Sequence, residues 1–285
     1  MLYLIVSVLC SVSVGVLLKH WGSRGLDAGQ LVTWNYLAAS SLAWAVLQPS
    51  TAVLSAPSTP WLLLLALGVA LPSVFLLMAR SLASAGIVRT DAAQRLSLLI
   101  SLAAAFLLFG EVANLWKLAG LGAGLVAIVC LLTRPPAARQ TAGRAWPWLL
   151  ATWAGYGAID IALKQVASSG TDTTAALGVS FALAFVLMLG IQLLRQWRGR
   201  TRLDGRHLAA GLLLGGLNFA NILTYIRAHQ AMSDSPATVF AGMNIGVVAL
   251  GTLAGVCLFG ERTSRINQAG LLLAIAAIAL IARGS

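Results

Sequence analysis

Charged side chains interrupt several long apolar segments of this chain, and their spacing could bind or carry ions. Asp160 and Lys164 stand four residues apart, which places them on one face of a helix. Asp91 and Arg95 have the same spacing, with Gln94 beside them. A charge inside a bilayer costs about 2.5–3.5 kcal/mol on insertion scales, so each needs a partner or a function. The first pair forms either a structural ion pair or a site for substrate or protons. For the second pair a structural or interfacial role is favoured.

Uncharged polar and aromatic side chains form a second group that could contact a small molecule. Asn218, Asn221 and Tyr225 follow an i, i+3, i+7 pattern, a helical stripe able to hydrogen-bond a ligand. Each residue type also has a structural alternative to ligand binding. The asparagines could form hydrogen bonds between helices, the aromatic residues could lie at the membrane interface, and Lys19 could extend its side chain to that interface. The predicted substrate-binding residues are Lys19, Trp34, Asn35, Gln94, Trp153, Tyr156, Asp160, Lys164, Asn218, Asn221, Tyr225 and Asn244, and the proton-coupling candidates are Asp160 and Asp91.

No combination of residues predicts catalysis. The chain lacks the His-Glu-x-x-His, Gly-x-Ser-x-Gly and phosphate-binding lysine-loop motifs. The cysteines share no metal-ligand spacing and are expected to be buried free thiols. We therefore expect no metal, no cofactor and no enzymatic activity, with a membrane-embedded enzyme as the less favoured alternative. The side chains considered were His20, His207 and His229, which do not cluster along the chain, and Cys10, Cys130 and Cys257.

The composition supplies elements that would hold these side chains inside a membrane. Of the 285 residues, 59% are hydrophobic and 9% are charged, which argues against a water-soluble domain. Continuous apolar runs of about 20 residues are typical of transmembrane helices, whereas barrel strands would alternate. The first run has no basic n-region or cleavage site, so we expect a retained helix. The sequence predicts an all-α integral membrane protein with ten transmembrane helices, at about 2–22, 29–48, 61–82, 88–109, 113–133, 146–168, 173–195, 206–231, 235–259 and 263–283.

One pattern occurs twice in the chain. Leu108–Glu111 and Leu258–Glu261 both have the sequence Leu-Phe-Gly-Glu, 150 residues apart, and Ala-Gly-Leu follows each at the same distance. A second match, 145 residues apart, joins Leu18-Lys19 to Leu163-Lys164. A duplication of this kind in a strongly apolar chain is typical of membrane transporters with internal repeats.

The duplication divides the chain into two halves. A first five-helix repeat at 1–133 is joined to a second at 146–285 by a basic, Pro-containing connector at 134–145. Since five is an odd number, the second half must enter the membrane in the opposite sense, as an inverted repeat. We expect Glu111 and Glu261 at the N-termini of the fifth and tenth helices, where the helix dipole stabilises them.

Basic residues are biased to one side of the predicted membrane. The loops and helix ends after the first, third, fifth, seventh and ninth helices hold fourteen lysines and arginines. The opposite loops hold only Lys117 and Arg283. Cytoplasmic loops carry the excess of positive charge in multi-pass proteins. We therefore predict a multi-pass protein of the plasma (inner) membrane with both termini extracytoplasmic. The net charge of +11 then reflects topology and does not indicate nucleic acid.

At the paired Leu-Phe-Gly-Glu segments the chain resembles the drug/metabolite transporter superfamily, specifically its ten-helix EamA-type members. In that family a Gly-Glu pair closes the fourth helix of each repeat and a Gly- and Ala-rich fifth helix follows. Both features occur here twice, and the resemblance covers essentially the whole chain. It implies alternating-access transport of small metabolites, often outward and without ATP. Two departures are the absence of proline at Arg95–Leu98 and Asn244–Val247, and the cytoplasmic termini with which relatives are usually drawn.

Charge suggests what such a transporter would carry. A surplus of positive charge in a low-dielectric cavity favours a carboxylate-bearing metabolite, with an amino acid preferred, and nearby aromatic rings would accept its apolar side chain. A drug or cation exporter of the same superfamily is the alternative. The expected partners are a small-molecule substrate, a proton or counter-substrate, and membrane lipid, for a monomer or homodimer. The charges counted are Lys19, Arg95, Lys164 and Arg227 against Asp91 and Asp160, a formal surplus of two.

Overall fold

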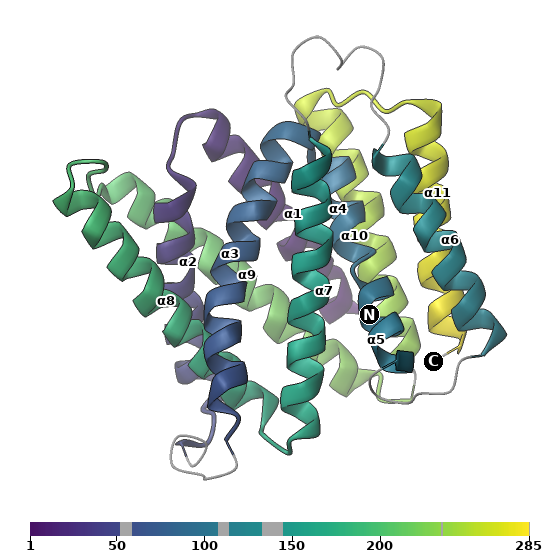
Figure 1. Ribbon diagram of the computed structural model, residues 1–285, viewed down its shortest axis with the longest axis horizontal. Helices are drawn as coiled ribbons and strands as arrows, with labels where there is room; N and C mark the ends of the chain where they lie inside the picture. The colour runs from purple at the N-terminus through teal and green to yellow at the C-terminus, as the bar shows by residue number, and fades with distance from the viewer. Residues whose placement is uncertain (52–58, 108–113, 133–144, 235, 285) are drawn as a thin grey trace.

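The computed structural model describes residues 1–51, 59–107, 114–132, 145–234 and 236–284, and it contains no strand within these ranges. Helices cross a single bundle from end to end (Figure 1). The protein is therefore an all-helical, multi-pass membrane protein, as its composition predicts. The elements are α1 (Leu2–Ser23), α2 (Ala28–Leu42), the π-helical turn η1 (Ala43–Leu47), α3 (Trp61–Ala85), α4 (Ile87–Arg95), α5 (Leu98–Leu107), α6 (Leu115–Leu132), α7 (Trp146–Ser168), α8 (Thr173–Trp197), α9 (Gly205–Ala231), α10 (Pro236–Phe259) and α11 (Arg265–Gly284).

Each of the ten predicted segments corresponds to helix, and two of them are divided. Among the described residues, seven helices are long and apolar enough to span a membrane: α1, α3, α6, α8, α9, α10 and α11. The second segment is divided into α2 and η1, and the fourth is divided into α4 and α5 at Leu96 and Ser97. The sixth, α7, is a continuous helix of 23 residues that carries Asp160 and Lys164 and is not among these seven.

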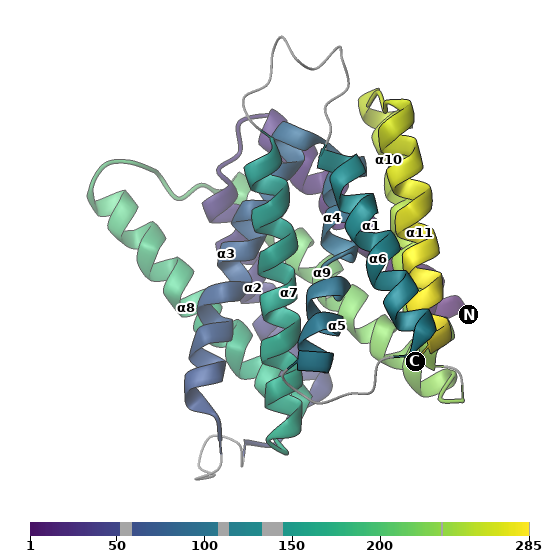
Figure 2. The same ribbon diagram turned by 45° about the vertical axis from the view of Figure 1, so that its right-hand side comes forward.

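Extensive helix contacts join the first half of the chain to the second. The main pairs are α6 with α11, α2 with α9, α1 with α9 and α3 with α7, and Figure 2 shows α6 and α11 together along one edge. Lipid offers no hydrophobic drive for helix association, so close packing depends on small residues. Gly211 and Gly215 of α9 allow α9 to pack closely against α2, because a Cβ at either glycine would collide with Trp34 or Asn35 of α2.

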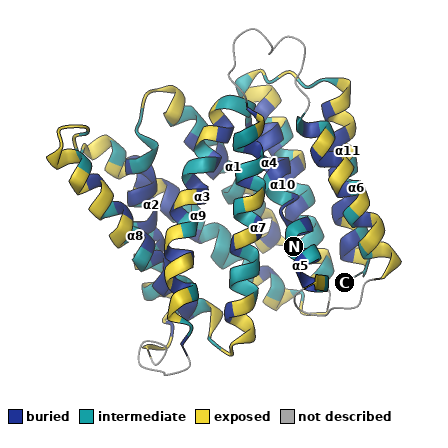
Figure 3. Cartoon of the chain, in the orientation of Figure 1, coloured by how far each residue is buried: buried dark blue, intermediate teal, exposed yellow. Residues whose placement is uncertain are grey.

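The outer surface of the bundle is apolar. Exposed large hydrophobic side chains lie along α3, α6 and α8, where Figure 3 shows many exposed positions. In water such an apolar surface would promote aggregation, whereas in a membrane it contacts the lipid acyl chains. Examples are Leu62, Leu65 and Val69 on α3, Leu118, Leu125 and Val129 on α6, and Val186 and Leu193 on α8.

Both termini lie at one end of the bundle, and α6 ends and α7 begins at the opposite end, on either side of the connector (Figure 1). We call these the terminal end and the connector end. The connector end includes the last turn of α8, the start of α9 and the bend between α1 and α2. Arg134, Arg139 and Arg144, which contribute to the predicted charge bias, lie outside the described residues.

The charge bias leads to a prediction about orientation. A periplasm-dependent reporter fused after Ser285 should be active and a cytoplasm-dependent reporter silent, because the arginine-rich connector end is expected in the cytoplasm. Reporters inserted at Gly199, between α8 and α9, should give the reverse pattern and serve as the control. A silent periplasmic reporter at Ser285, with an active one at Gly199, would invert the topology.

Candidate functional site

A cavity of about 640 Å³ lies inside the bundle. Its walls come from α4, α5, α7, α8, α9 and α10, and it reaches from Arg95 to Thr173 and Thr174 in the first turn of α8. The cavity therefore extends from the interior toward the terminal end. Its polar lining residues are Gln94, Arg95, Ser97, Tyr156, Asp160, Thr173, Thr174, Asn221, Tyr225 and Asn244, and apolar residues such as Leu98, Leu177, Ile222 and Phe240 complete it.

The break between α4 and α5 forms the deepest part of the wall. The chain turns at Leu96 and Ser97, so the helical hydrogen-bond ladder is interrupted inside the bundle. Trp153 of α7 donates its indole N–H to the Leu96 carbonyl at 2.9 Å, and this carbonyl also accepts the Leu99 N–H, so the indole links the break to α7. Ser97 and Ser101 donate their hydroxyls to Asp160 Oδ2 at 3.3 and 3.1 Å. Discontinuous helices of this kind are typical of transporter binding sites.

Arg95 ends α4 and presents its guanidinium to the cavity. Its Nη2 donates to Ser11 Oγ of α1 at 2.7 Å, and its buried Nε has no hydrogen-bond partner among the described residues. A guanidinium with unused donors inside a membrane protein is well suited to a carboxylate, which accepts two parallel hydrogen bonds from it. Arg95 therefore belongs to the candidate site rather than having only the structural role favoured from its spacing.

Six of the twelve predicted binding residues line this cavity, and a seventh lies next to it. Asn218 lies in a smaller void beside the cavity, which also contains the proton-coupling candidate Asp91. The stripe predicted on α9 is thus divided between two compartments. The six residues in the cavity are Gln94, Tyr156, Asp160, Asn221, Tyr225 and Asn244.

Lys19, Trp34 and Asn35 lie away from the cavity. Lys19 Nζ forms an ion pair with Glu261 at the connector end and lies 4.4 Å from the centre of the Phe259 ring. Trp34 and Asn35 pack against the glycines of α9, and Asn35 is fully buried. The candidate site does not include these three residues, since their neighbours are other helices.

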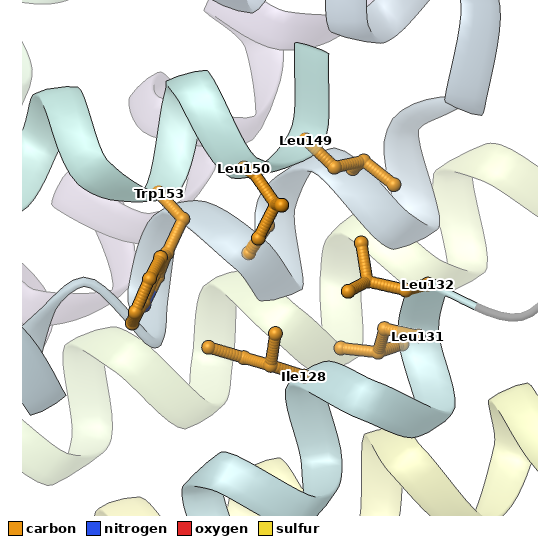
Figure 4. Close-up of a pocket in the computed structure, with 7 residues that line it drawn as sticks. Ile128, Leu131, Leu132, Leu149, Leu150 and Trp153 are labelled. Carbon is orange, nitrogen blue, oxygen red and sulfur yellow. The ribbon is translucent and has the colours of Figure 1, made fainter. Parts of the chain in front are cut away.

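Trp153 and Lys164, both on α7, are also separate from the lining. Trp153 borders an apolar crevice between α6 and α7 that is too small for a metabolite, about 10 Å³. Figure 4 shows its ring near Leu150, with Ile128 of α6 nearby. Its indole N–H donates to the Leu96 carbonyl at the break between α4 and α5. Lys164 is half-buried, and the neighbouring residue Leu163 lines the cavity instead.

Several contacts join the two halves of the chain at the connector end. Both carboxylate oxygens of Glu261 accept backbone N–H groups at the start of α4, from Ile87 at 2.7 Å and Val88 at 3.1 Å, and the same carboxylate pairs with Lys19. Gly86 permits this approach, because its φ is +86° and a Cβ there would lie 2.6 Å from the carboxylate. Glu261 therefore caps α4. The expectation that it caps the tenth predicted helix, which is α11 in the structure, is wrong, and Glu111 lies outside the described residues.

A second contact between the halves lies at the same end. Arg195, in the last turn of α8, donates Nη1 and Nη2 to the two oxygens of Asp27 at 3.0 and 2.8 Å. The Arg195 hydrogen bonds hold the pKa of Asp27 below its usual value. Asp27 also accepts the backbone N–H of Gln30 at the start of α2. Both cross-half ion pairs would have to separate if the bundle opened toward the connector end.

The serines and threonines of the lining were not predicted from the sequence. Ser97 lies in an apolar segment predicted as one continuous helix, and Thr173 and Thr174 lie at a predicted segment start. A sequence feature that could have indicated a polar lining here is the stretch Gln94-Arg95-x-Ser97 in the middle of that segment. Polar groups there are compatible with a helix break that lines a cavity.

Comparison with known proteins agrees with this architecture. Residues 1–133 match the EamA-like transporter family. An uncharacterized protein of Haemophilus influenzae is 41% identical over 281 residues, which covers 96% of this chain and 95% of the relative. The match thus extends over both halves of the chain.

Proposed function

The chain belongs to the EamA-like transporter family, and we propose that its 640 Å³ cavity is the binding site of a secondary transporter. The observation that carries this proposal is the cavity itself, in which a broken helix places Arg95 opposite polar side chains of α7, α9 and α10. A small metabolite would bind between the halves and cross between the two ends, by export or by exchange, without chemical change.

The substrate that suits this lining is an amino acid. Arg95 offers donors for a carboxylate, Asp160 offers an acceptor for an ammonium group, and apolar residues such as Phe240 would contact a side chain. Only one cation and one anion line the cavity among the described residues, so the predicted surplus of two positive charges is wrong for this site. Lys19 is paired with Glu261, and Arg227 is exposed. The balance favours a zwitterion over a simple anion.

The transport cycle would be a rocking motion of one half against the other. The inverted repeat predicted from the sequence supports this scheme, because two related halves can exchange their arrangements around a fixed central site. Opening at the connector end would break the Lys19–Glu261 and Asp27–Arg195 contacts, and new contacts would close the terminal end. The direction of net transport then depends on the gradients and not on this geometry.

A lipophilic cation is the second candidate substrate. Asp160 could hold a cationic head, and the apolar part of the lining could hold its hydrocarbon body. The membrane-embedded enzyme receives no support from the family, whose members are transporters.

Ligand binding tests the substrate class. Thermal-shift measurements on the purified protein should compare the twenty common amino acids, small mono- and dicarboxylates without an amine, and tetraalkylammonium compounds. We expect amino acids to raise the melting temperature most, because they alone offer both charges to Arg95 and Asp160. Stabilisation by tetraalkylammonium compounds only, unchanged in an Arg95→Ala variant, would replace the amino acid proposal by the cation alternative.

A further inference from the structure

A second, smaller compartment lies beside the main cavity on its connector side. It has a volume of about 50 Å³, enough for one or a few water molecules. Gln94, Tyr156 and Asn221 line both spaces, so the two compartments share a polar wall. Its other polar lining residues are Ser11, Asp91 and Asn218.

Asp91 is the exceptional side chain in this compartment. The residue is only 6% exposed, and Oδ2 has no hydrogen-bond partner among the described residues. Glycines of two other helices make room for the carboxylate: Gly251 of α10 lies against Oδ2, and a Cβ on Gly15 of α1 would be 3.7 Å from Oδ1. A buried carboxylate without donors is costly as an anion, and binding a proton removes that cost.

The groups that face Asp91 limit what could bind there. Arg95 lies one turn away on the same helix, and Tyr156 of α7 lines the same void. The Lys19–Glu261 pair lies at the start of α4, while α3 contributes Phe75 and Met78. A metal cation would meet the positive charge of Arg95 and would not fit with a hydration shell. A proton meets neither obstacle.

We propose that Asp91 is a proton-binding site that exchanges with the cavity through this void and that substrate and proton bind together. Asp160, the other candidate, differs from Asp91 because it accepts two serine hydroxyls. When Asp91 is ionised, its charge competes with a substrate carboxylate for Arg95. When water of the void transfers a proton to the Asp91 carboxylate, Arg95 becomes free to bind the substrate. By linkage, the substrate raises the affinity for the proton by the same factor. The inference rests on the proposed transport function.

The test uses proteoliposomes with a pH-sensitive dye inside and an equimolar mixture of the twenty common amino acids as the probe. Adding the mixture outside should acidify the interior in wild type, because proton and substrate enter together. Asp91→Asn mimics the protonated side chain, so it should lower this signal to that of protein-free vesicles while exchange of radiolabelled amino acids stays within about twofold of wild type. Asp204→Asn, at the exposed start of α9, should change neither signal.

Four outcomes separate the ideas. Exchange in wild type without any change of internal pH would overturn the proton site, whatever the variants do. An alkaline change would overturn joint binding. Loss of both exchange and proton movement in Asp91→Asn, in a protein with the wild-type melting temperature, would make Asp91 part of the substrate site instead. Absence of amino acid exchange in wild type would count against the proposed function itself, since it precedes any question of coupling.

Discussion

Replacing Arg95 by alanine is expected to weaken binding of a carboxylate-bearing substrate at least 100-fold in a protein that is still folded and inserted. The guanidinium lines the cavity with an unused donor, and its hydrogen bond to Ser11 is one that the fold can lose without leaving a buried charge. A charge-assisted, bidentate contact of this kind is worth about 3 kcal/mol, which corresponds to a 100-fold change in affinity. Equilibrium binding of the best amino acid from the thermal-shift panel measures it.

Two further variants test whether substrate affinity depends on the planar shape of the guanidinium and on its position in the cavity. Arg95→Lys keeps the charge but loses the planar fork, so it should recover only part of the affinity. Arg89 is the matched control, because it also belongs to α4 but donates to the Leu131 and Leu132 carbonyls at the end of α6. Arg89→Lys should lower the melting temperature and leave substrate affinity unchanged. Wild-type affinity in folded Arg95→Ala would remove this residue from the site.

Replacing Glu261 by glutamine should shift the protein away from the conformation seen here. The Glu261 carboxylate accepts two backbone amides of α4 and pairs with Lys19, so three contacts between the halves depend on one charge. Hydrogen bonds to a charged group contribute about 1.5–3 kcal/mol each, and glutamine replaces at most one of them well. Weakening the connector end should therefore lower the population whose cavity reaches the terminal end, and net transport should fall strongly.

Cysteine accessibility measures this shift directly. In a background without Cys10, Cys130 and Cys257, a cysteine at Thr174 lies at the terminal end of the cavity. Its reaction with a membrane-impermeant maleimide should be several-fold slower in Glu261→Gln. Asp204→Asn serves as the control, since its carboxylate contacts Arg206 and His207 of its own half. Equal labelling rates in wild type and Glu261→Gln would show that the pair does not hold the connector end closed.

The helices were predictable because a bilayer leaves little choice. Each span needs about 20 apolar residues and internal backbone hydrogen bonds, so uninterrupted apolar runs mark helix positions closely. The break at Leu96 and Ser97 was not predictable by the same logic, because neither residue is a proline or glycine. It is stabilised by Trp153, whose indole reaches across from a helix that begins 50 residues later.

The candidate site was predictable only where a helix face points inward. The inward stripe of α9 and the residues Tyr156 and Asp160 of α7 could be identified from spacing within one helix. Lys19 could not be assigned this way, since its partner Glu261 lies 242 residues further along the chain. Spacing also made Asp91 and Arg95 look like an ion pair, whereas in the structure Arg95 bonds Ser11 and Asp91 Oδ2 has no hydrogen-bond partner among the described residues. The partners of these side chains come from helices that are distant in the sequence, so spacing within one helix does not identify them.

The central claim is that this chain moves a small metabolite through the cavity that contains Arg95. Counterflow in proteoliposomes tests it most directly: vesicles are loaded with an unlabelled amino acid, and a trace of the radiolabelled compound is added outside. We expect transient accumulation of unaltered label in wild type, with none in Arg95→Ala and normal accumulation in Arg89→Lys. Accumulation in Arg95→Ala equal to wild type, or no accumulation in wild type of any amino acid, carboxylate or quaternary ammonium compound tested, would contradict it.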